Sequence, residues 1–191
     1  MERVVLVRHG PTMVEPDVPQ DQWRLSPEGE NIVRSWAECQ SWDGVTQLYT
    51  SPEAKAVETA AMISQTANIP VAGIDDGLRE LRVPFIASRG EFLARMERYL
   101  GGFPDPDFEP WESAQARIHS SIHAIQARHA GQSIAVVSHG RILTAYLSGI
   151  LSRRLSEREW LAIQMPDSAV VDMEAGRVLK GFAQWPPEVW E

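Results

Sequence analysis

VVLVRHG (residues 4–10) and IAVVSHG (residues 134–140) are two matched stretches of the chain, each an apolar run that ends in His-Gly. Short runs rich in β-branched residues are typical of strands buried on both faces, as in a parallel sheet. Ligands of open parallel sheets bind at the carboxyl ends of the strands. If these two strands are neighbours, His9 and His139 converge on one crevice.

Outward from these stretches, helical and strand patterns alternate. Besides the two His-Gly strands (3–7 and 133–138), the spacing of apolar residues predicts strands at 45–50, 69–74, 169–173 and 178–182, and helices at 27–40, 53–67, 91–100, 111–129 and 142–151. Such alternation predicts an α/β fold, a three-layer α/β/α sandwich with a mostly parallel central sheet. The irregular stretch at about 82–110 is expected to be a small inserted cap, and residues 1–191 a single domain.

Composition limits the classes of partner. The 191 residues are 43% hydrophobic, and 26 acidic residues outnumber 18 Lys and Arg, for a net charge of −8. An acidic protein is a poor match for nucleic acid or an anionic membrane, so neither is expected as a partner. The only cysteine, Cys39, fits a reducing compartment, and no long apolar segment or secretory signal is visible, so a cytoplasmic location is expected. Nothing in the composition predicts an oligomeric state.

The predicted crevice is cationic. Arg8 precedes the first His-Gly pair, while Gly10 and Gly140 would let the backbone approach a ligand closely. The helix after Gly140 would aim free N–H groups at the same place, which favours an anion. A phosphate or a carboxylate is therefore the expected ligand. The alternative is that both histidines only form hydrogen bonds with backbone groups at the strand ends. Two titratable side chains at matching strand ends, with an arginine beside one of them, favour a functional site instead.

The chain resembles branch 1 of the histidine phosphatase superfamily, which is also called the phosphoglycerate mutase-like group. Five segments carry the resemblance in the family's order. They are Arg8-His9-Gly10 with Thr12, Leu25-Ser26-x-x-Gly29, Tyr49-Thr50-Ser51-Pro52 through Thr59-Ala60 (similar to YSSPLxRAxQTA), Leu78-x-Glu80-Leu81, and Ser138-His139-Gly140. The resemblance covers nearly the whole chain and implies one histidine phosphatase-like domain.

The resemblance also implies roles for particular residues. His9 would be the nucleophile that becomes phosphohistidine, a choice between the two histidines that the residues alone leave open. Arg8 and His139 would hold the phosphate oxygens, with Lys55 and Gly140 also in the phosphate site. Glu80 would protonate the leaving oxygen and then activate water. No metal and no other cofactor is implied.

Two residues depart from the family pattern. Lys55 stands where the family usually has arginine, and lysine cannot make a planar bidentate contact with phosphate. We expect Lys55 to point into the pocket and Lys55→Arg to raise catalytic efficiency. Glu15 stands where many mutase-like members carry asparagine, and its carboxylate would repel a phosphate dianion, so we expect it to turn away or to meet a cationic part of the substrate.

The leading hypothesis is a metal-independent phosphomonoesterase that hydrolyses a small phosphorylated molecule. A phosphoglycerate mutase-like phosphotransferase and a catalytically weak phospho-ligand-binding protein are the alternatives. His119 and His123 lie four residues apart on a predicted helix, which is a possible metal-ligand spacing. They lack a visible third ligand, so a solvated helix face is the expected explanation.

Overall fold

The computed structural model describes residues 2–190 and contains a six-stranded sheet in the order β3-β2-β4-β1-β5-β6. The strands are β1 (Arg3–Arg8), β2 (Val45–Thr50), β3 (Val71–Ile74), β4 (Ser133–Ser138), β5 (Asp167–Asp172) and β6 (Arg177–Lys180). β1 to β4 run parallel, β5 runs antiparallel to β1, and β6 runs antiparallel to β5. The predicted mostly parallel sheet is confirmed.

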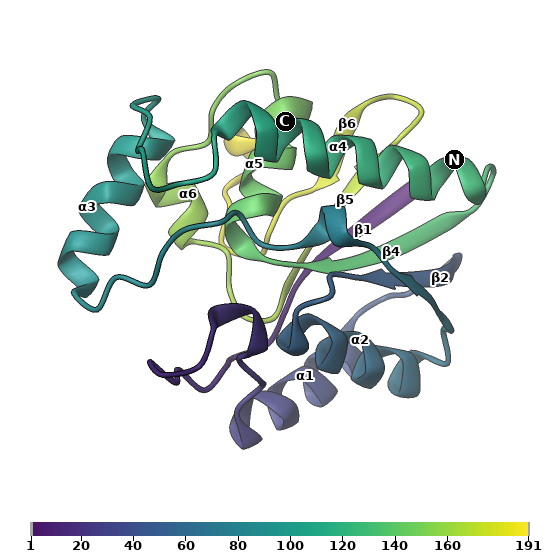
Figure 1. Ribbon diagram of the computed structural model, residues 1–191. Coiled ribbons are helices and arrows are strands. Elements are labelled where there is room, and N and C mark those ends of the chain that lie inside the picture. The colour runs from purple at the N-terminus through teal and green to yellow at the C-terminus, as the bar shows by residue number, and fades with distance from the viewer. Residues whose placement is uncertain (1, 191) are drawn as a thin grey trace.

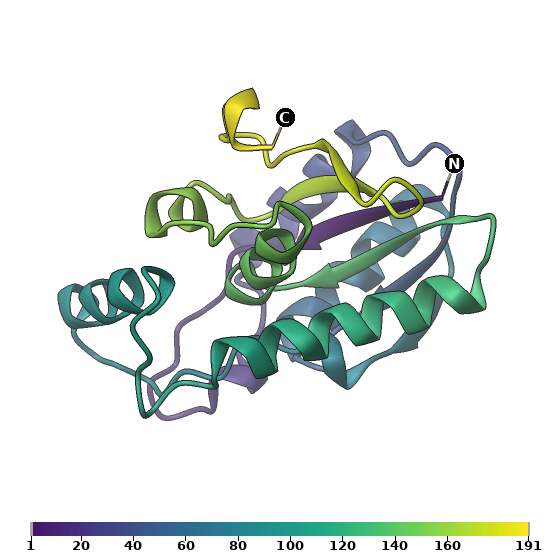
Figure 2. The same ribbon diagram turned by 90° about the horizontal axis from the view of Figure 1, so that it is seen from above.

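Helices cover both faces of this sheet. They are α1 (Pro27–Cys39), α2 (Ala54–Ala67), α3 (Arg89–Leu100), α4 (Trp111–Arg128), α5 (Gly140–Ile150) and α6 (Glu157–Leu161). Figure 1 shows α1 and α2 below the sheet and α4 and α5 above it, which gives three layers. α3 and α6 lie beyond the carboxyl ends of β1 and β4, as the view from above also shows (Figure 2).

Alternating side chains of the central strands build the two cores. Val4 and Leu6 of β1 face the core beneath α4 and α5, whereas Val7 faces the core beneath α1 and α2. β4 repeats this pattern, and all six of its residues are buried. A strand with both faces covered reads as a continuous apolar run, which is why the two stretches could be recognised.

The segment at about 82–110 is attached to the sandwich through Glu109. The buried Glu109 carboxylate accepts a hydrogen bond from the Arg82 backbone N–H (3.1 Å) and pairs with both ends of the Arg117 guanidinium (2.8 and 3.0 Å). The hydroxyl of Tyr99, on α3, donates to the Glu109 carbonyl (2.7 Å). One charged residue therefore joins both ends of this segment to α4.

Several element bounds differ from the predicted ones by one or two residues, and one helix was not predicted. α5 begins at Gly140 and not at 142, so His139 itself is its N-cap residue. β6 ends two residues early because Phe182 turns into the core, where its ring packs edge-on to Trp185 with centroids 5.2 Å apart. α6 was not predicted, although Ser156 and Glu159 form a capping box at its start.

No helix within residues 2–190 is both long enough and apolar enough to cross a membrane.

Candidate active site

β1 and β4 are neighbours, so the two His-Gly stretches end side by side. Arg8 pairs in register with Ser138, and the His9 N–H donates to the Ser138 carbonyl (3.0 Å). The two imidazole rings that follow have centroids 5.1 Å apart. The predicted convergence of His9 and His139 is thus present in the structure.

The His9 ring is held in one tautomer. Its Nδ1 lies 2.7 Å from the carbonyl oxygen of Gly10, and a carbonyl can only accept, so Nδ1 carries the proton. The lone pair is then on Nε2. Burial, and then the nearby His139 and Arg8, lower the pKa of His9 well below its ordinary value, so the ring is neutral and the lone pair on Nε2 is free.

Gly10 is required by the packing around this turn. A Cβ atom at this position would lie 2.3 Å from Cγ2 of Val33, which is buried in α1. The Gly10 N–H donates to the Thr59 hydroxyl (3.1 Å), which fixes the turn against α2.

His139 is oriented from behind by Ser51. Its Nε2 lies 2.7 Å from Ser51 Oγ, and Ser51 Oγ also accepts from the Glu53 N–H (3.3 Å). That hydroxyl can donate to Nε2 or accept from it, and the Glu53 carboxylate, which can only accept, lies 3.5 Å from the same nitrogen. Burial lowers the pKa of His139 well below its ordinary value, with Lys55 and Arg141 adding to the effect.

Two buried nitrogen atoms without a partner lie at this pair of rings. Within residues 2–190, the buried side-chain atoms that lack a hydrogen-bond partner are Arg8 Nε, His139 Nδ1 and Gln126 Oε1. The first two belong to residues that lie close to His9. Buried polar groups of folded proteins are normally paired, so two orphaned nitrogen atoms beside one ring, one of them in a guanidinium cation, indicate an anion site.

Arg8 is placed by α5 and by the segment after α6. Its Nη1 donates to the Ile163 carbonyl, and a Cβ at Gly140 would lie only 3.1 Å from the Arg8 guanidinium carbon. The absent side chain of Gly140 therefore makes room for the arginine. Burial lowers the pKa of Arg8 to about 10, so the side chain is still a cation at neutral pH.

Glu80 occupies the N-terminus of α5. Its carboxylate accepts from the N–H groups of Leu81 and Ile142 (both 2.9 Å) and pairs with Arg141 (3.2 Å). Burial favours the neutral acid, but the Arg141 charge and these two backbone donors outweigh it and hold the pKa of Glu80 below its ordinary value. The Ile142 N–H, one of the helix N–H groups expected to be free for a ligand anion, is therefore occupied by the protein's own carboxylate.

Lys55 is buried and points into the site, as predicted. Its ammonium group donates to the Gln20 carbonyl (2.7 Å) and to the Glu53 carboxylate (2.5 Å). The other Glu53 oxygen accepts from the Glu80 N–H (2.6 Å) and lies 3.5 Å from His139 Nε2. Glu53 thus connects three of the sequence-predicted residues.

All six predicted site residues meet at this edge of the sheet, namely Arg8, His9, Lys55, Glu80, His139 and Gly140. Sequence reasoning missed Glu53 and Arg141. A charged residue at the leucine position of the YSSPLxRAxQTA pattern was the available signal for Glu53. The basic residue directly after the second His-Gly pair was the signal for Arg141.

Two further expectations concern residues outside this cluster. Glu15 is exposed, which agrees with the expectation that it turns away. His119 and His123 stack on α4 with ring centroids 6.3 Å apart, and His119 contacts the Tyr146 carbonyl (3.1 Å). Within residues 2–190, no group of three or more potential ligands (His, Cys, Asp or Glu) could hold a metal ion.

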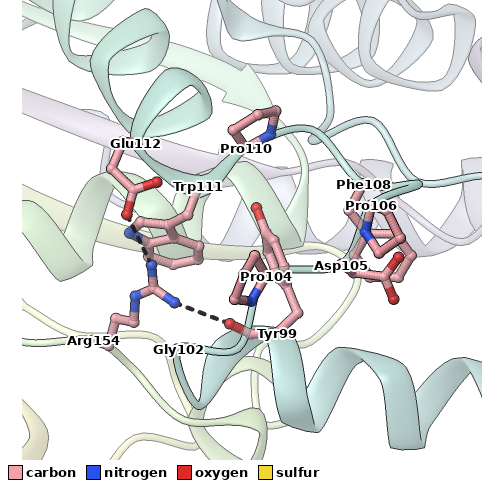
Figure 3. A pocket seen from close by; sticks show the side chains of 10 residues that line it. All are labelled: Tyr99, Gly102, Pro104, Asp105, Pro106, Phe108, Pro110, Trp111, Glu112 and Arg154. Carbon is pink, nitrogen blue, oxygen red and sulfur yellow. Dashed lines mark hydrogen bonds and ion pairs between the residues drawn. The ribbon is translucent and has the colours of Figure 1, made fainter.

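One cavity lies apart from the histidine pair. It measures about 490 Å³ and lies between the end of α3, the loop after it, and the start of α4. Figure 3 shows its prolines and aromatic rings, with the Arg154 side chain between the Tyr99 carbonyl and Glu112. Because none of the clustered site residues lines it, we place the candidate active site at the strand ends and not in this cavity.

The chain is similar to several known proteins. The chain is 29% identical over 163 residues to a probable phosphoglycerate mutase GpmB from Cronobacter sakazakii, over 79% of this chain and 75% of that protein. The structure of Bacillus stearothermophilus YhfR superposes with a TM-score of 0.76 at 18% identity, over 96% of this chain and 97% of that one. A phosphoserine phosphatase from Entamoeba histolytica in complex with 3-phosphoglyceric acid gives a TM-score of 0.72 at 18% identity, over 95% and 96% of the two chains.

The two structural likenesses show the fold, and the family follows from the sequence itself. The sequence profile of the histidine phosphatase superfamily (branch 1) matches residues 4–180. The chain therefore belongs to branch 1 of the histidine phosphatase superfamily.

Proposed function

We propose that this protein is a phosphomonoesterase that needs no metal and hydrolyses a small phosphorylated molecule through a phosphohistidine intermediate. The observation that carries the proposal is the arrangement around His9. A neutral imidazole with its lone pair on Nε2 lies near two buried nitrogen atoms that lack a partner, Arg8 Nε and His139 Nδ1. Such an arrangement suits a phosphoryl group held by its non-bridging oxygens while nitrogen attacks phosphorus.

In the first step, His9 Nε2 would attack phosphorus and the bond to the ester oxygen would break. The electron pair of that bond goes to the leaving oxygen, which takes a proton from the Glu80 carboxyl group. Arg8, Lys55 and His139 would stabilise the charge on the three non-bridging oxygens. Arg8 and Lys55 supply the positive charge that a metal ion supplies in other phosphoryl-transfer enzymes.

In the second step, water would attack the phosphohistidine. The ionised Glu80 takes one proton of that water, the P–N bond breaks, and its electron pair returns to His9 Nε2. The hydrogen bonds that hold Glu80 ionised suit this second role as a base. For the first role a proton must be present, and a bound phosphate dianion favours it by raising the pKa of a nearby carboxyl group.

The segment at about 82–110 is our candidate for the part that meets the leaving group. It follows Glu80 directly in the chain, and α3 lies beyond the strand ends where the histidines meet (Figure 2). The solved relatives named as phosphatases of phosphoserine and of glucosyl-3-phosphoglycerate support a small phosphorylated substrate.

A mutase is the second candidate, because the curated relatives are named probable phosphoglycerate mutases. A mutase would pass the phosphoryl group of His9 to a second hydroxyl in place of water. Release of phosphate without any added acceptor separates the two activities.

The test is hydrolysis of p-nitrophenyl phosphate in excess chelator by the wild type, His9→Ala and His123→Ala. His123 is exposed on α4 and serves as the matched control. We expect the wild type and His123→Ala to release phosphate despite the chelator and His9→Ala to be inactive. A rapid denaturing quench should trap phosphate on His9, detectable by mass spectrometry of the intact chain.

A folded wild type without activity from acid to neutral pH would overturn the hydrolase proposal. It would favour the hypothesis of a phospho-ligand-binding protein. Full activity in His9→Ala would remove the phosphohistidine mechanism. Phosphate transfer that depends on an added acceptor would establish the mutase.

A further inference from the structure

Glu53 is an unexpected residue for a phosphate site. Its carboxylate is only 9% exposed and lies beside the Lys55 ammonium group, which is 8% exposed. An anion at this position opposes the binding of a second anion, and burying it costs free energy unless it is well paired. Because Glu53 opposes anion binding and is costly to bury, its presence here calls for an explanation beyond packing.

The contacts of Glu53 provide that explanation. One carboxylate oxygen accepts from Lys55, and the other accepts from the Glu80 N–H and faces His139 Nε2 at 3.5 Å. Glu53 therefore contacts three residues of the candidate site. Within residues 2–190, it forms no hydrogen bond or ion pair with Arg8 or His9.

Lysine is the cation that suits this carboxylate. The Lys55 ammonium group has three donors, of which Gln20 and Glu53 take two, so one N–H is left for a phosphate oxygen. An arginine at 55 would present a planar fork that matches a carboxylate bidentately. Next to Glu53, that fork would bind the carboxylate in place of the phosphate.

We propose that Glu53 is a positioning residue that holds Lys55 and His139 toward the phosphate, and that Glu53 and Lys55 act as one unit in place of the leucine and arginine of the YSSPLxRAxQTA pattern. This inference rests on the proposed function of the same site. It changes the expectation for Lys55→Arg: the single substitution lowers turnover, and arginine becomes favourable only after Glu53 is replaced.

The experiment is a double-mutant cycle of the full-length chain with Glu53→Leu, Lys55→Arg and the double variant. Lys180→Arg is the matched control, since Lys180 is the only other lysine and is exposed on β6. Two quantities are measured for each protein: kcat with p-nitrophenyl phosphate, and the Kd of inorganic phosphate by calorimetry. Thermal unfolding checks that each variant is folded.

We expect each single substitution to lower kcat by about tenfold or more, and the double variant to recover most of that loss, because residues in contact couple strongly. Lys180→Arg should equal the wild type. Losses that simply multiply in the double variant would overturn the inference, and so would a gain in kcat for Lys55→Arg alone.

Glu53→Gln decides the question if Glu53→Leu fails to fold, because it keeps the shape and removes the charge. Loss of a negative charge beside the anion should lower the Kd of inorganic phosphate, while the loosened Lys55 and His139 should lower kcat. A residue with a merely structural role would not tighten phosphate binding. An unchanged kcat with unchanged or weaker phosphate binding would overturn the proposal.

Failure of the inference is distinct from failure of the proposed function. A wild type that hydrolyses the ester while the cycle is additive refutes only the unit of Glu53 and Lys55. If the wild type proves inactive, the same cycle in phosphate affinity tests the unit without turnover, and additivity there refutes it.

Discussion

At the scale of single residues, the site depends on which side of each ring carries a proton. Gly10 fixes the His9 tautomer through a carbonyl, and Ser51 orients the His139 ring through a hydroxyl. Both rings are buried and neutral because burial lowers the pKa of each. The site is therefore prepared before any ligand arrives, which reduces the reorganisation that a phosphoryl transfer needs.

Glu80→Gln tests the proton donor. Glutamine cannot supply a proton, so a poor leaving group suffers more than a good one. We expect about a 10²–10⁴-fold loss of kcat with an alkyl phosphate and a much smaller loss with p-nitrophenyl phosphate, whose leaving group needs little protonation. Because the pKa of Glu80 is lowered, wild-type turnover of the alkyl ester should fall as pH rises. Equal losses on both substrates would show that Glu80 is not the acid.

Gly10→Ala tests the packing at the first His-Gly turn. The new methyl group would meet Val33 Cγ2 at 2.3 Å, so α1 or the turn must shift. Overpacking of this kind costs about 1–3 kcal/mol of unfolding free energy, measurable by urea denaturation. The variant Gly90→Ala is the control, since a Cβ there meets no atom within 4 Å. Equal stability of the two variants would contradict the prediction.

At the scale of elements, the strand ends and the helices that follow them create the site. The register that pairs Arg8 with Ser138 puts the two histidines at one level of the sheet. α5 then starts immediately at His139, so its first turn faces the same place and holds Glu80. The two similar stretches form one site because β1 and β4 are parallel neighbours in the sheet.

Arg117, on α4, holds the loop that carries Glu80. Its guanidinium pairs with Glu109 and also donates to the carbonyls of Gly77 and Arg79 (2.8 and 3.0 Å). Arg117→Ala leaves the buried Glu109 carboxylate unpaired, so we expect a loss of about 3–5 kcal/mol of stability and lower turnover as Glu80 loosens.

Arg128→Ala on the same helix is the control for that substitution. Its ion pair with Asp75 is long (4.0 Å) and its side chain is 55% exposed, so a loss below about 1 kcal/mol is expected. Urea denaturation and kcat measured in parallel on both variants check the difference. A similar stability and turnover for both would show that Arg117 does not hold the loop.

The elements could be predicted largely from sequence, because strands buried on both faces and amphipathic helices leave clear patterns. The six clustered site residues were found through two repeated strand ends and a family pattern. Glu53 and the occupation of the α5 N-terminus by Glu80 were not predictable in the same way. Both depend on which of several nearby charges pair, and that choice is made only by side-chain geometry across three separate segments.

At the scale of the whole molecule, an acidic chain encloses a small cationic site. The net charge of −8 repels anions at long range, whereas Arg8, Lys55 and Arg141 lie together inside. Two buried carboxylates, Glu53 and Glu80, offset part of that positive charge. Binding of an anion is therefore controlled by a few short contacts, and salt should weaken it less than it weakens binding to a broadly basic surface.

The buried histidines also make the stability of the whole fold depend on pH. Both His9 and His139 have a pKa well below 6.5 in the folded protein, so between these values the unfolded chain binds more protons. The stability that comes from keeping both rings neutral is complete above pH 6.5 and is lost as pH falls below it. For each ring, the free energy of unfolding should fall by about 1.4 kcal/mol per pH unit in that range, because one unit of pKa corresponds to that free energy.

Urea denaturation at pH 7.0 and pH 5.5 measures this effect. The wild type should lose about 2–3 kcal/mol between the two pH values for the two rings together, and His9→Ala about half as much. His123→Ala, which removes an exposed histidine, should behave like the wild type. Saturating inorganic phosphate should reduce the acid loss, since an anion between the rings favours their protonated forms in the folded state. If His9→Ala lost as much stability as the wild type, the His9 imidazole would not be buried in its neutral form in the folded protein, and the nucleophile would have to be sought elsewhere.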